Sequence, residues 1–211
     1  MITTIYRFVN EGLIKFISDI LFAVFLLIFL SPLILLIILI LFFFSSEKIF
    51  YFQKRIGMNG SFFTLIKFRT MSSDPEILNT YFDRNPKERR LWIEKQKLFH
   101  DPRITKIGNF LREFSLDELP QILNVLIGQM SFIGPRPIVV SEIAKYGSNF
   151  KLYKTIRPGI SGLWQVSGRN NTTYKERVDF DIFYVENRNF LLDFKIFFKT
   201  FSAVFSRYGA Y

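Results

Sequence analysis

The sequence predicts a mostly helical α+β protein that combines a membrane-anchoring element with one folded domain. Three observations support this fold class. Residues 20–44 carry no charged side chain, residues 49–68 alternate aromatic runs with turn residues, and much of the remaining chain spaces its apolar residues as helices do. At 211 residues the chain is long enough for one domain with its own core in addition to the anchor. We place the anchor at 1–46 and the domain at 47–211.

The composition indicates a surface that meets both apolar and anionic material. The chain contains 27 Phe, and its 28 Lys and Arg against 18 Asp and Glu give a formal net charge of +10. A lipid bilayer fits this description. We do not expect nucleic acid as a partner, because no zinc-finger, RNP-like or basic-zipper pattern accompanies the charge. The absence of Cys and the single His, His100, exclude disulfides and argue against a zinc centre.

The uncharged segment 20–44 is long enough for a transmembrane helix, but Ser31 and Pro32 divide it. Each half is about 17 Å long as a helix, too short for a hydrocarbon core of roughly 30 Å. Basic residues flank both ends, among them Arg7 and Lys48, so the positive-inside rule allows both ends on one side. From the residues alone, a single kinked span and a re-entrant helix both stay open.

The segment 49–68 predicts two strands joined by a turn, because Gly and Asn residues separate its aromatic runs. Alternation along the second strand would place Lys67 and Arg69 on one face and Phe68 on the other. The two cations are candidates for contact with phosphate or with a membrane surface. The common alternative is an ordinary polar strand face.

The rest of the chain predicts mainly helices. Residues 72–99 mix charges of both signs, which is typical of solvent-exposed helix and loop, and a short helix through Asn109 to Glu113 follows. Helical spacing continues at 138–149, 174–187 and 190–207. The last of these sets Phe residues against Lys and Arg, a pattern typical of a core-facing helix and equally of a helix in the membrane interface.

Residues 157–171 form a glycine-punctuated segment with an aromatic side chain, Trp164, and several hydrogen-bond donors. The donors are Arg157, Gln165, Arg169, Asn170 and Asn171. Such a loop suits a sugar or a base as ligand. A structural loop around a packed Trp is the alternative.

The stretch from Ser115 to Pro137 holds the strongest candidates for chemistry. Ser115 and Glu118 have the spacing of a capping box, which predicts a helix starting there with Asp117 and Glu118 in its first turn. Arg136 stands between two prolines, which stiffen the backbone that carries its guanidinium. Acidic residues in a first turn usually only cap a helix. Together with a rigid arginine fork, they are what a diphosphate ester with a divalent cation requires.

Several motifs, in the same order, resemble those of the bacterial sugar transferases, the monotopic phosphoglycosyl transferases. They are Lys67–Met71, Ser115–Gln121, Gly134–Pro137 and Arg157–Arg169. The resemblance covers nearly the whole chain. It implies a re-entrant membrane helix broken at Ser31 and Pro32, amphipathic interfacial helices, and a catalytic domain on the cytoplasmic face of the bacterial inner membrane.

The resemblance also implies a reaction. A sugar 1-phosphate would pass from a UDP-sugar to polyprenol (undecaprenyl) phosphate with release of UMP, as the first membrane step of a capsule, exopolysaccharide or O-antigen pathway. The sequence from Trp164 to Arg169 is more similar to that of family members that transfer a hexose. Transfer of an N-acetylated or diacetamido sugar is the alternative. Asp117 maps to a nucleophile that forms a covalent phosphosugar intermediate, and Glu118 to its partner in holding Mg²⁺. Arg136 would grip phosphate oxygens.

Further candidates for substrate or phosphate binding are Lys67, Arg69, Arg112, Arg157, Gln165 and Arg169. The expected partners are the UDP-sugar, the polyprenol phosphate and membrane lipid, and a homodimer stays open. The alternative from another class is a membrane-anchored basic adaptor in which Asp117 and Glu118 only cap a helix.

Overall fold

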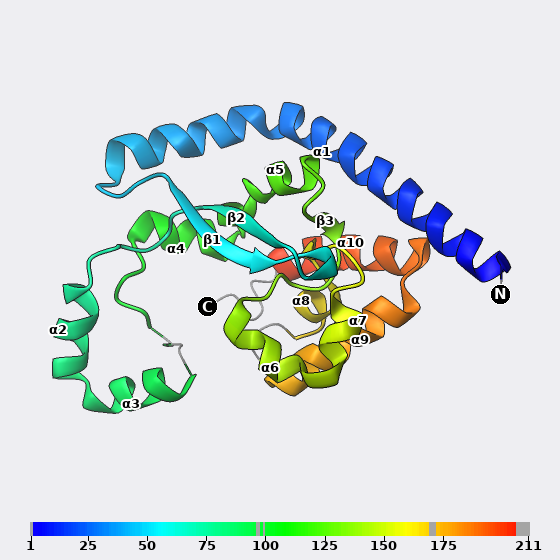
Figure 1. The fold of residues 1–211 in the computed structure, drawn as a ribbon. Coiled ribbons are helices and arrows are strands. Elements are labelled where there is room, and N and C mark those ends of the chain that lie inside the picture. Colours follow the sequence, from blue (N-terminus) through cyan, green and yellow to red (C-terminus); the bar gives the residue numbers. More distant parts are fainter. Residues whose placement is uncertain (1, 96–97, 99, 169–171, 206–211) are drawn as a thin grey trace.

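The fold comes from a computed structural model, which describes residues 2–95, 98, 100–168 and 172–205 (Figure 1). One long helix, α1 (Ile2–Phe44), lies along one side of the molecule. Short helices and two small sheets form the domain beneath it. The mostly helical α+β class predicted from the sequence is therefore confirmed.

α1 runs without interruption through Ser31 and Pro32, where the sequence suggested a break. Pro32 has no backbone N–H to donate to the carbonyl of Ile28, and the Ser31 hydroxyl donates to that carbonyl instead, at 2.8 Å. Because this bond replaces the missing one, the helix arches over the domain without breaking (Figure 1). Within the described part of the chain, it is the one helix long and apolar enough to cross a membrane.

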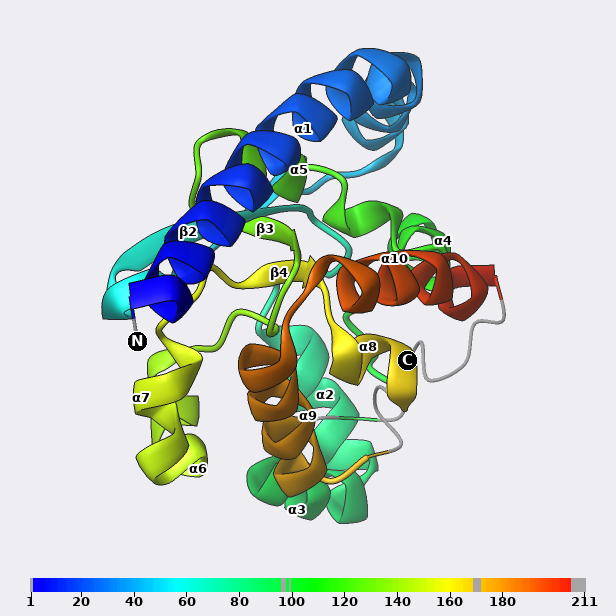
Figure 2. The ribbon, with the colours of Figure 1, turned by 90° about the vertical axis from the view of Figure 1, so that its right-hand side faces the viewer.

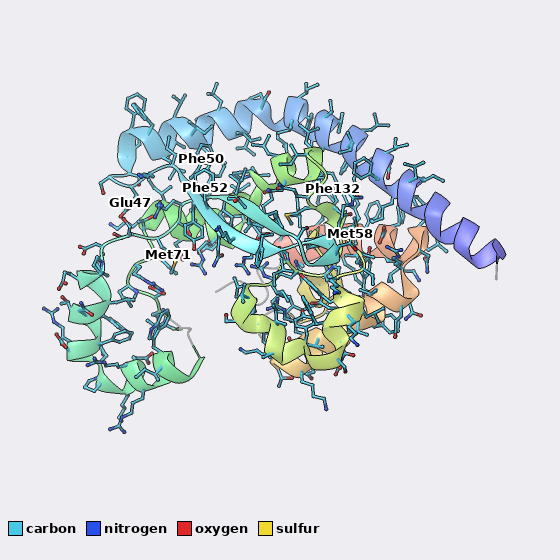
Figure 3. All side chains as sticks on the ribbon, viewed as in Figure 1. Glu47, Phe50, Phe52, Met58, Met71 and Phe132 are labelled. Atoms are coloured by element: carbon cyan, nitrogen blue, oxygen red, sulfur yellow. The ribbon has the colours of Figure 1, made fainter. Side chains whose placement is uncertain are left out.

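Both halves of α1 pack on the domain. Before Pro32, Ala23 is fully buried in a cluster with Leu65, and after it Leu41 packs with Phe68. From Leu13 to Phe44, the opposite face of the helix exposes large apolar side chains (Figure 3). They include Leu13, Ile14, Ile17, Leu21, Phe25, Ile28, Phe29, Leu35, Leu36, Leu39, Phe42, Phe43 and Phe44.

The hairpin predicted at 49–68 is confirmed. β1 (Phe50–Ile56) and β2 (Phe62–Phe68) pair antiparallel, and the turn between them places Asn59 and Gly60 in the left-handed region, at φ 58° and 78°. Phe68 is buried beneath α1 while Lys67 faces the other way, as strand alternation requires.

A second sheet joins two of the sequence motifs. β3 (Ser131–Ile133) and β4 (Gly159–Ser161) pair in parallel, so the segment predicted as a loop at 157–171 instead contains a strand and a short helix, α8 (Leu163–Ser167). The backbones meet closely: a Cβ added at Gly159 would lie 2.2 Å from the Gly134 nitrogen. Only glycine permits this approach.

The helices agree with the sequence pattern in most places. α2 (Glu76–Arg84) and α3 (Pro86–Lys95) form the exposed arm seen in Figure 1, and α4 (Lys106–Glu113) is capped by Thr105. The predicted helix at 174–187 is α9 (Tyr174–Asn187). The helix predicted at 138–149 is shorter than expected: the 3-10 turn Val140–Glu142 leads into α6 (Ile143–Tyr146), which ends before Gly147 at φ 53°. The 3-10 turn Gly147–Asn149 then leads to α7 (Phe150–Tyr153), outside the predicted range.

α10 (Phe190–Phe205) presents two faces. Ile196 is fully buried against Tyr184 of α9, which confirms a core-facing side. Phe194 and Phe198 lie exposed on the other side with neighbouring aromatic rings, and an interfacial role for that face stays a prediction. In Figures 1 and 2, α9 lies on the side of the domain farthest from α1.

Candidate active site

Asp117 and Glu118 lie in a single 3-10 turn, Leu116–Glu118, ahead of α5 (Gln121–Leu126). The predicted capping box is wrong. Ser115 has a left-handed backbone, with φ 55°, and its side chain makes no capping hydrogen bond. α5 begins only after Pro120, whose fixed φ suits a first turn. The acidic pair therefore precedes the helix, and its orientation depends on contacts with other elements.

Two cations from separate elements converge on the acidic pair. Lys67 Nζ, near the end of β2, lies 2.6 Å from Glu118 Oε1 and 3.7 Å from Asp117 Oδ2. Arg136 Nη1 lies 3.5 Å from the same Glu118 oxygen. Both cations thus neutralise chiefly Glu118, and Asp117 is the less compensated carboxylate.

The electrostatics separate the two carboxyl groups. Burial raises the pKa of each, but at Glu118 the charges of Lys67 and Arg136 outweigh burial and lower the pKa to about 2. At Asp117, burial together with repulsion from Glu118 outweighs the attraction of Lys67, so its pKa is raised. Perturbed, unequal carboxyl groups in one site are typical of catalytic acids, bases and nucleophiles.

A small cavity beside the pair is lined by two residues that the sequence pattern did not single out, Arg55 and Gln121. Burial and repulsion by Arg136 lower the pKa of Arg55 to about 10. Arg55 could have been found from the hairpin register, because Tyr51 pairs with Lys67 and alternation then places Arg55 on the Lys67 face.

Trp164 is connected to the site through Arg136. The guanidinium carbon of Arg136 lies 5.9 Å from the centre of the Trp164 ring, and that of Arg177 lies 4.8 Å from it. The indole N–H donates to Thr172 at 2.7 Å. Trp164, the aromatic side chain predicted to contact a ligand, therefore lies beside Arg136, which in turn contacts Glu118.

Three other predicted ligands have different surroundings. Arg112, in the last turn of α4, is close enough for its charge to lower the pKa of Asp117. Arg69 lies 5.7 Å from the centre of the Tyr51 ring. Arg169 falls outside the described residues. Binding roles for these arginines stay predictions.

Arg157 and Gln165 have structural partners. Arg157 forms an ion pair with Asp19 of α1 at 2.7 Å and also donates to the carbonyl of Met130 at 2.8 Å. Gln165 donates to the carbonyl of Ile160 at 3.1 Å. The structure therefore brings Arg157 to the anchoring helix and not to the acidic pair.

The carboxylate oxygens of the acidic pair suit a metal cation that also binds a phosphate substrate. Among the described residues, no group of three or more His, Asp or Glu side chains forms a protein-only metal cage. Mg²⁺ is usually held by one or two carboxylates together with phosphate oxygens and water. Asp117 and Glu118 supply such a carboxylate pair.

Comparison with known proteins gives consistent matches. Residues 10–207 match the model of the family described as bacterial sugar transferase. The exopolysaccharide production protein ExoY of Sinorhizobium fredii is 46% identical over 201 residues, which cover 95% of this chain and 89% of that protein.

Two longer relatives carry more specific names. The undecaprenyl-phosphate galactose phosphotransferase of Salmonella typhimurium is 42% identical over 203 residues, covering 96% of this chain and 42% of its own length. The UDP-glucose:undecaprenyl-phosphate glucose-1-phosphate transferase of Klebsiella pneumoniae is 36% identical over 208 residues, covering 93% and 41%. This chain thus spans less than half of each of these two proteins.

Proposed function

Because this chain belongs to the bacterial sugar transferase family, we propose that it transfers a sugar 1-phosphate from a UDP-sugar to polyprenol phosphate. The products are a polyprenyl diphospho-sugar and UMP. Its relatives are named as transferases that act on undecaprenyl phosphate, so the protein is an enzyme, and the adaptor alternative is set aside.

The observation that carries the proposal is the unequal pairing of the two carboxylates. Glu118 is held by Lys67 and Arg136, while Asp117 keeps a raised pKa beside them. In the proposed reaction an Asp117 oxygen attacks the sugar-bearing phosphorus, and the bond from that phosphorus to the UMP oxygen breaks with its electron pair leaving on UMP. An oxygen of polyprenol phosphate then attacks the same phosphorus and releases Asp117.

The neighbouring residues have complementary roles in this proposal. Lys67 and Arg136 stabilise negative charge on the phosphate oxygens. Asp117 and Glu118 would hold Mg²⁺, which supplies positive charge to the departing nucleotide. Trp164 offers a flat apolar surface beside Arg136.

The anchor supports a location at a membrane. We place the protein in the bacterial inner membrane with its domain on the cytoplasmic face, as the family resemblance implies. Both halves of α1 pack on this one domain while the outer face exposes apolar side chains. This arrangement favours a helix that enters and leaves one leaflet over a span with a half on each side.

The proposed donor is a UDP-hexose, and the proposed pathway is synthesis of a surface polysaccharide. Relatives named for galactose, for glucose and for exopolysaccharide production support this choice. A donor with an N-acetylated or diacetamido sugar is the alternative.

A panel of UDP-sugars tests the proposal. The purified protein in lipid nanodiscs, with Mg²⁺ and undecaprenyl phosphate, should release UMP from UDP-glucose or UDP-galactose faster than from UDP-N-acetylglucosamine or a UDP-diacetamido sugar. Without the acceptor, a donor labelled at its sugar phosphate should leave label on the denatured protein. UMP release without any protein-bound label would exclude the covalent mechanism, and release only from an acetamido donor would exclude the hexose.

A further inference from the structure

The backbone that carries Arg136 is held by a buried tyrosine. Tyr153, the last residue of α7, donates its hydroxyl to the carbonyl of Arg136 at 3.0 Å. The same hydroxyl oxygen accepts from the N–H of Ile138 at 3.2 Å. One side-chain oxygen therefore bridges backbone groups on both sides of Pro137.

Two further side chains hold the next peptide groups. Arg55 Nη1 donates to the carbonyl of Pro137 at 2.9 Å, and Glu142 accepts from the N–H of Val139 at 3.0 Å. Glu142 also pairs with Arg177 at 3.1 Å. These contacts come from β1, from the turn before α6 and from α9, so the segment is fixed to the domain from several directions.

The side chain of Arg136 is less constrained than its backbone. Its Nη1 lies 3.5 Å from Glu118 Oε1, its guanidinium carbon lies 5.9 Å from the centre of the Trp164 ring, and 30% of the side chain is exposed. The flanking prolines restrict its backbone angles. Two backbone bonds also anchor the segment: the Pro135 carbonyl accepts from the Gly159 N–H at 2.8 Å, and the Ile138 carbonyl accepts from the Ile56 N–H at 3.0 Å. The direction in which the guanidinium reaches therefore depends on the hydrogen bonds that the segment makes.

We propose that Tyr153 is a positioning residue for Arg136: its hydroxyl fixes the Arg136–Ile138 backbone and so aims the guanidinium at the acidic pair. The kinetic part of this inference rests on the function proposed above. A misplacement of about 1 Å at a reacting group can cost on the order of 100-fold in rate, so a residue that never touches substrate can limit catalysis in this way.

Tyr146 is a matched control for the loss of the bond between Tyr153 and the Ile138 N–H. Tyr146 and Tyr153 are both 2% exposed, and their ring centres lie 4.9 Å apart in one cluster. The Tyr146 hydroxyl, however, donates to Asp181 Oδ2 at 2.6 Å, and Asp181 in turn interacts with the backbone N–H of Arg136. The N–H of Ile138 donates to Tyr153 and not to Tyr146. Replacing either residue by Phe removes one buried hydroxyl and leaves the ring in place.

The first measurement does not depend on enzyme activity. In Tyr153→Phe, amide hydrogen exchange at Ile138 should speed up roughly tenfold or more, because its N–H loses its acceptor. Tyr146→Phe should leave the exchange rate of the Ile138 amide unchanged. The melting temperature of each variant measures how much stability the lost hydroxyl costs. Equal exchange at Ile138 in Tyr153→Phe and in the unmodified protein would overturn the proposal whatever the protein catalyses.

The second measurement is a double-mutant cycle with Arg136→Lys. Tyr153→Phe should lower kcat/KM roughly tenfold in the unmodified background and less than about twofold in the Arg136→Lys background, since a residue that acts through Arg136 has nothing left to position. The same factor in both backgrounds would overturn the positioning role. Absence of transfer by the unmodified protein would instead refute the proposed function, and the exchange measurement would still decide whether Tyr153 holds the segment.

Discussion

Asp19 of α1 and Arg157 of the domain form a buried ion pair at 2.7 Å, across 138 positions of sequence. Their side chains are 6% and 10% exposed. Removing one member of such a pair leaves a buried charge without a partner, which typically costs about 3–5 kcal/mol. Together with the ion pair between Lys15 and Asp193 of α10, it attaches α1 to the domain through polar groups.

Asp19→Asn and Arg157→Gln should therefore each lower the free energy of unfolding by several kcal/mol, while the apolar pair Asp19→Leu/Arg157→Met should recover much of the loss. Chemical denaturation in detergent micelles measures this, with exposed Ser18→Ala as the control. If Arg157 instead served mainly to bind phosphate, Arg157→Met would retain stability but lose affinity for the donor.

Asp117→Asn should abolish both transfer and covalent labelling, by a factor of about 1,000 or more, because an amide is a poor nucleophile. The melting temperature should not fall, since the ion pair of Asp117 with Lys67 is long, at 3.7 Å. Glu118→Gln should be nearly as severe but should lose stability as well, since it breaks the 2.6 Å bond with Lys67. Near-normal turnover in purified Asp117→Asn would remove Asp117 as the nucleophile.

Arg136→Lys should lose most of the activity, because lysine keeps the charge but not the planar pair of donors or the surface over Trp164. Initial rates over a range of UDP-sugar concentrations separate the effects on KM and kcat. Equal kinetics in the variant and the unmodified protein would show that charge alone suffices at this position.

The acid limb of the pH–rate profile should report Asp117, whose pKa lies above its ordinary value. Activity needs the ionised form, so it should fall as pH drops through that raised pKa, well before Glu118 is protonated at about 2. Lys67→Met removes the attraction that lowers the Asp117 pKa and should move the limb to higher pH. If the acid limb lies at the same pH in Lys67→Met and in the unmodified protein, the titrating group is not Asp117.

The same two carboxyl groups affect stability with opposite signs. Glu118 has a depressed pKa, so its stabilising contribution is present above the unfolded value of about 4.3 and is lost as pH falls toward 2. Asp117 binds its proton more tightly when folded, so it disfavours the folded state once it ionises. In Asp117→Asn the free energy of unfolding should therefore rise relative to the unmodified protein on going from pH 4 to pH 7.

Topology can be tested with single cysteines, since the chain has none. Thr4→Cys and Ser46→Cys lie on either side of the apolar part of α1, and Ser46 is exposed. Ser46 is preferable to its neighbour Glu47, whose carboxylate is bound by Ser72 and Ser73. A membrane-impermeant thiol reagent applied to intact cells should label neither cysteine and should label both after lysis.

Labelling of Thr4→Cys alone in intact cells would show a true span. Replacing Ser31 and Pro32 by leucine should shift part of the population to that state, because the helix could then straighten.

The sequence was most informative where structure depends on local pattern or on motifs. The hairpin turn at Asn59 and Gly60 and helix α9 could both be predicted from neighbouring residues. The acidic pair could be singled out in the same way, and its catalytic role stays a prediction. The capping box failed because Glu118 is bound by Lys67, a residue 51 positions away whose competition no local rule includes. The ion pair of Arg157 with Asp19 was missed for the same reason, since the two residues lie in separate elements, and phosphate binding by Arg157 stays a prediction.

The short parallel sheet was also missed. Three residues in β3 and three in β4 are too few to show alternation, and their pairing depends on the close contact at Gly134 and Gly159. Similarly, Tyr153 has no sequence signal that connects it with Arg136, because the connection runs through backbone groups.

The burial of both halves of α1 has a practical consequence for anyone who wants a water-soluble version of this enzyme. Trimming the chain to start after Phe44 would uncover Leu65 and Val125 at one end of the domain and Phe68 and Leu111 at the other, all of them 2% exposed or less. It would also leave Arg157 without its counter-ion. The trimmed protein should aggregate, because what looks like a detachable anchor supplies one wall of the hydrophobic core.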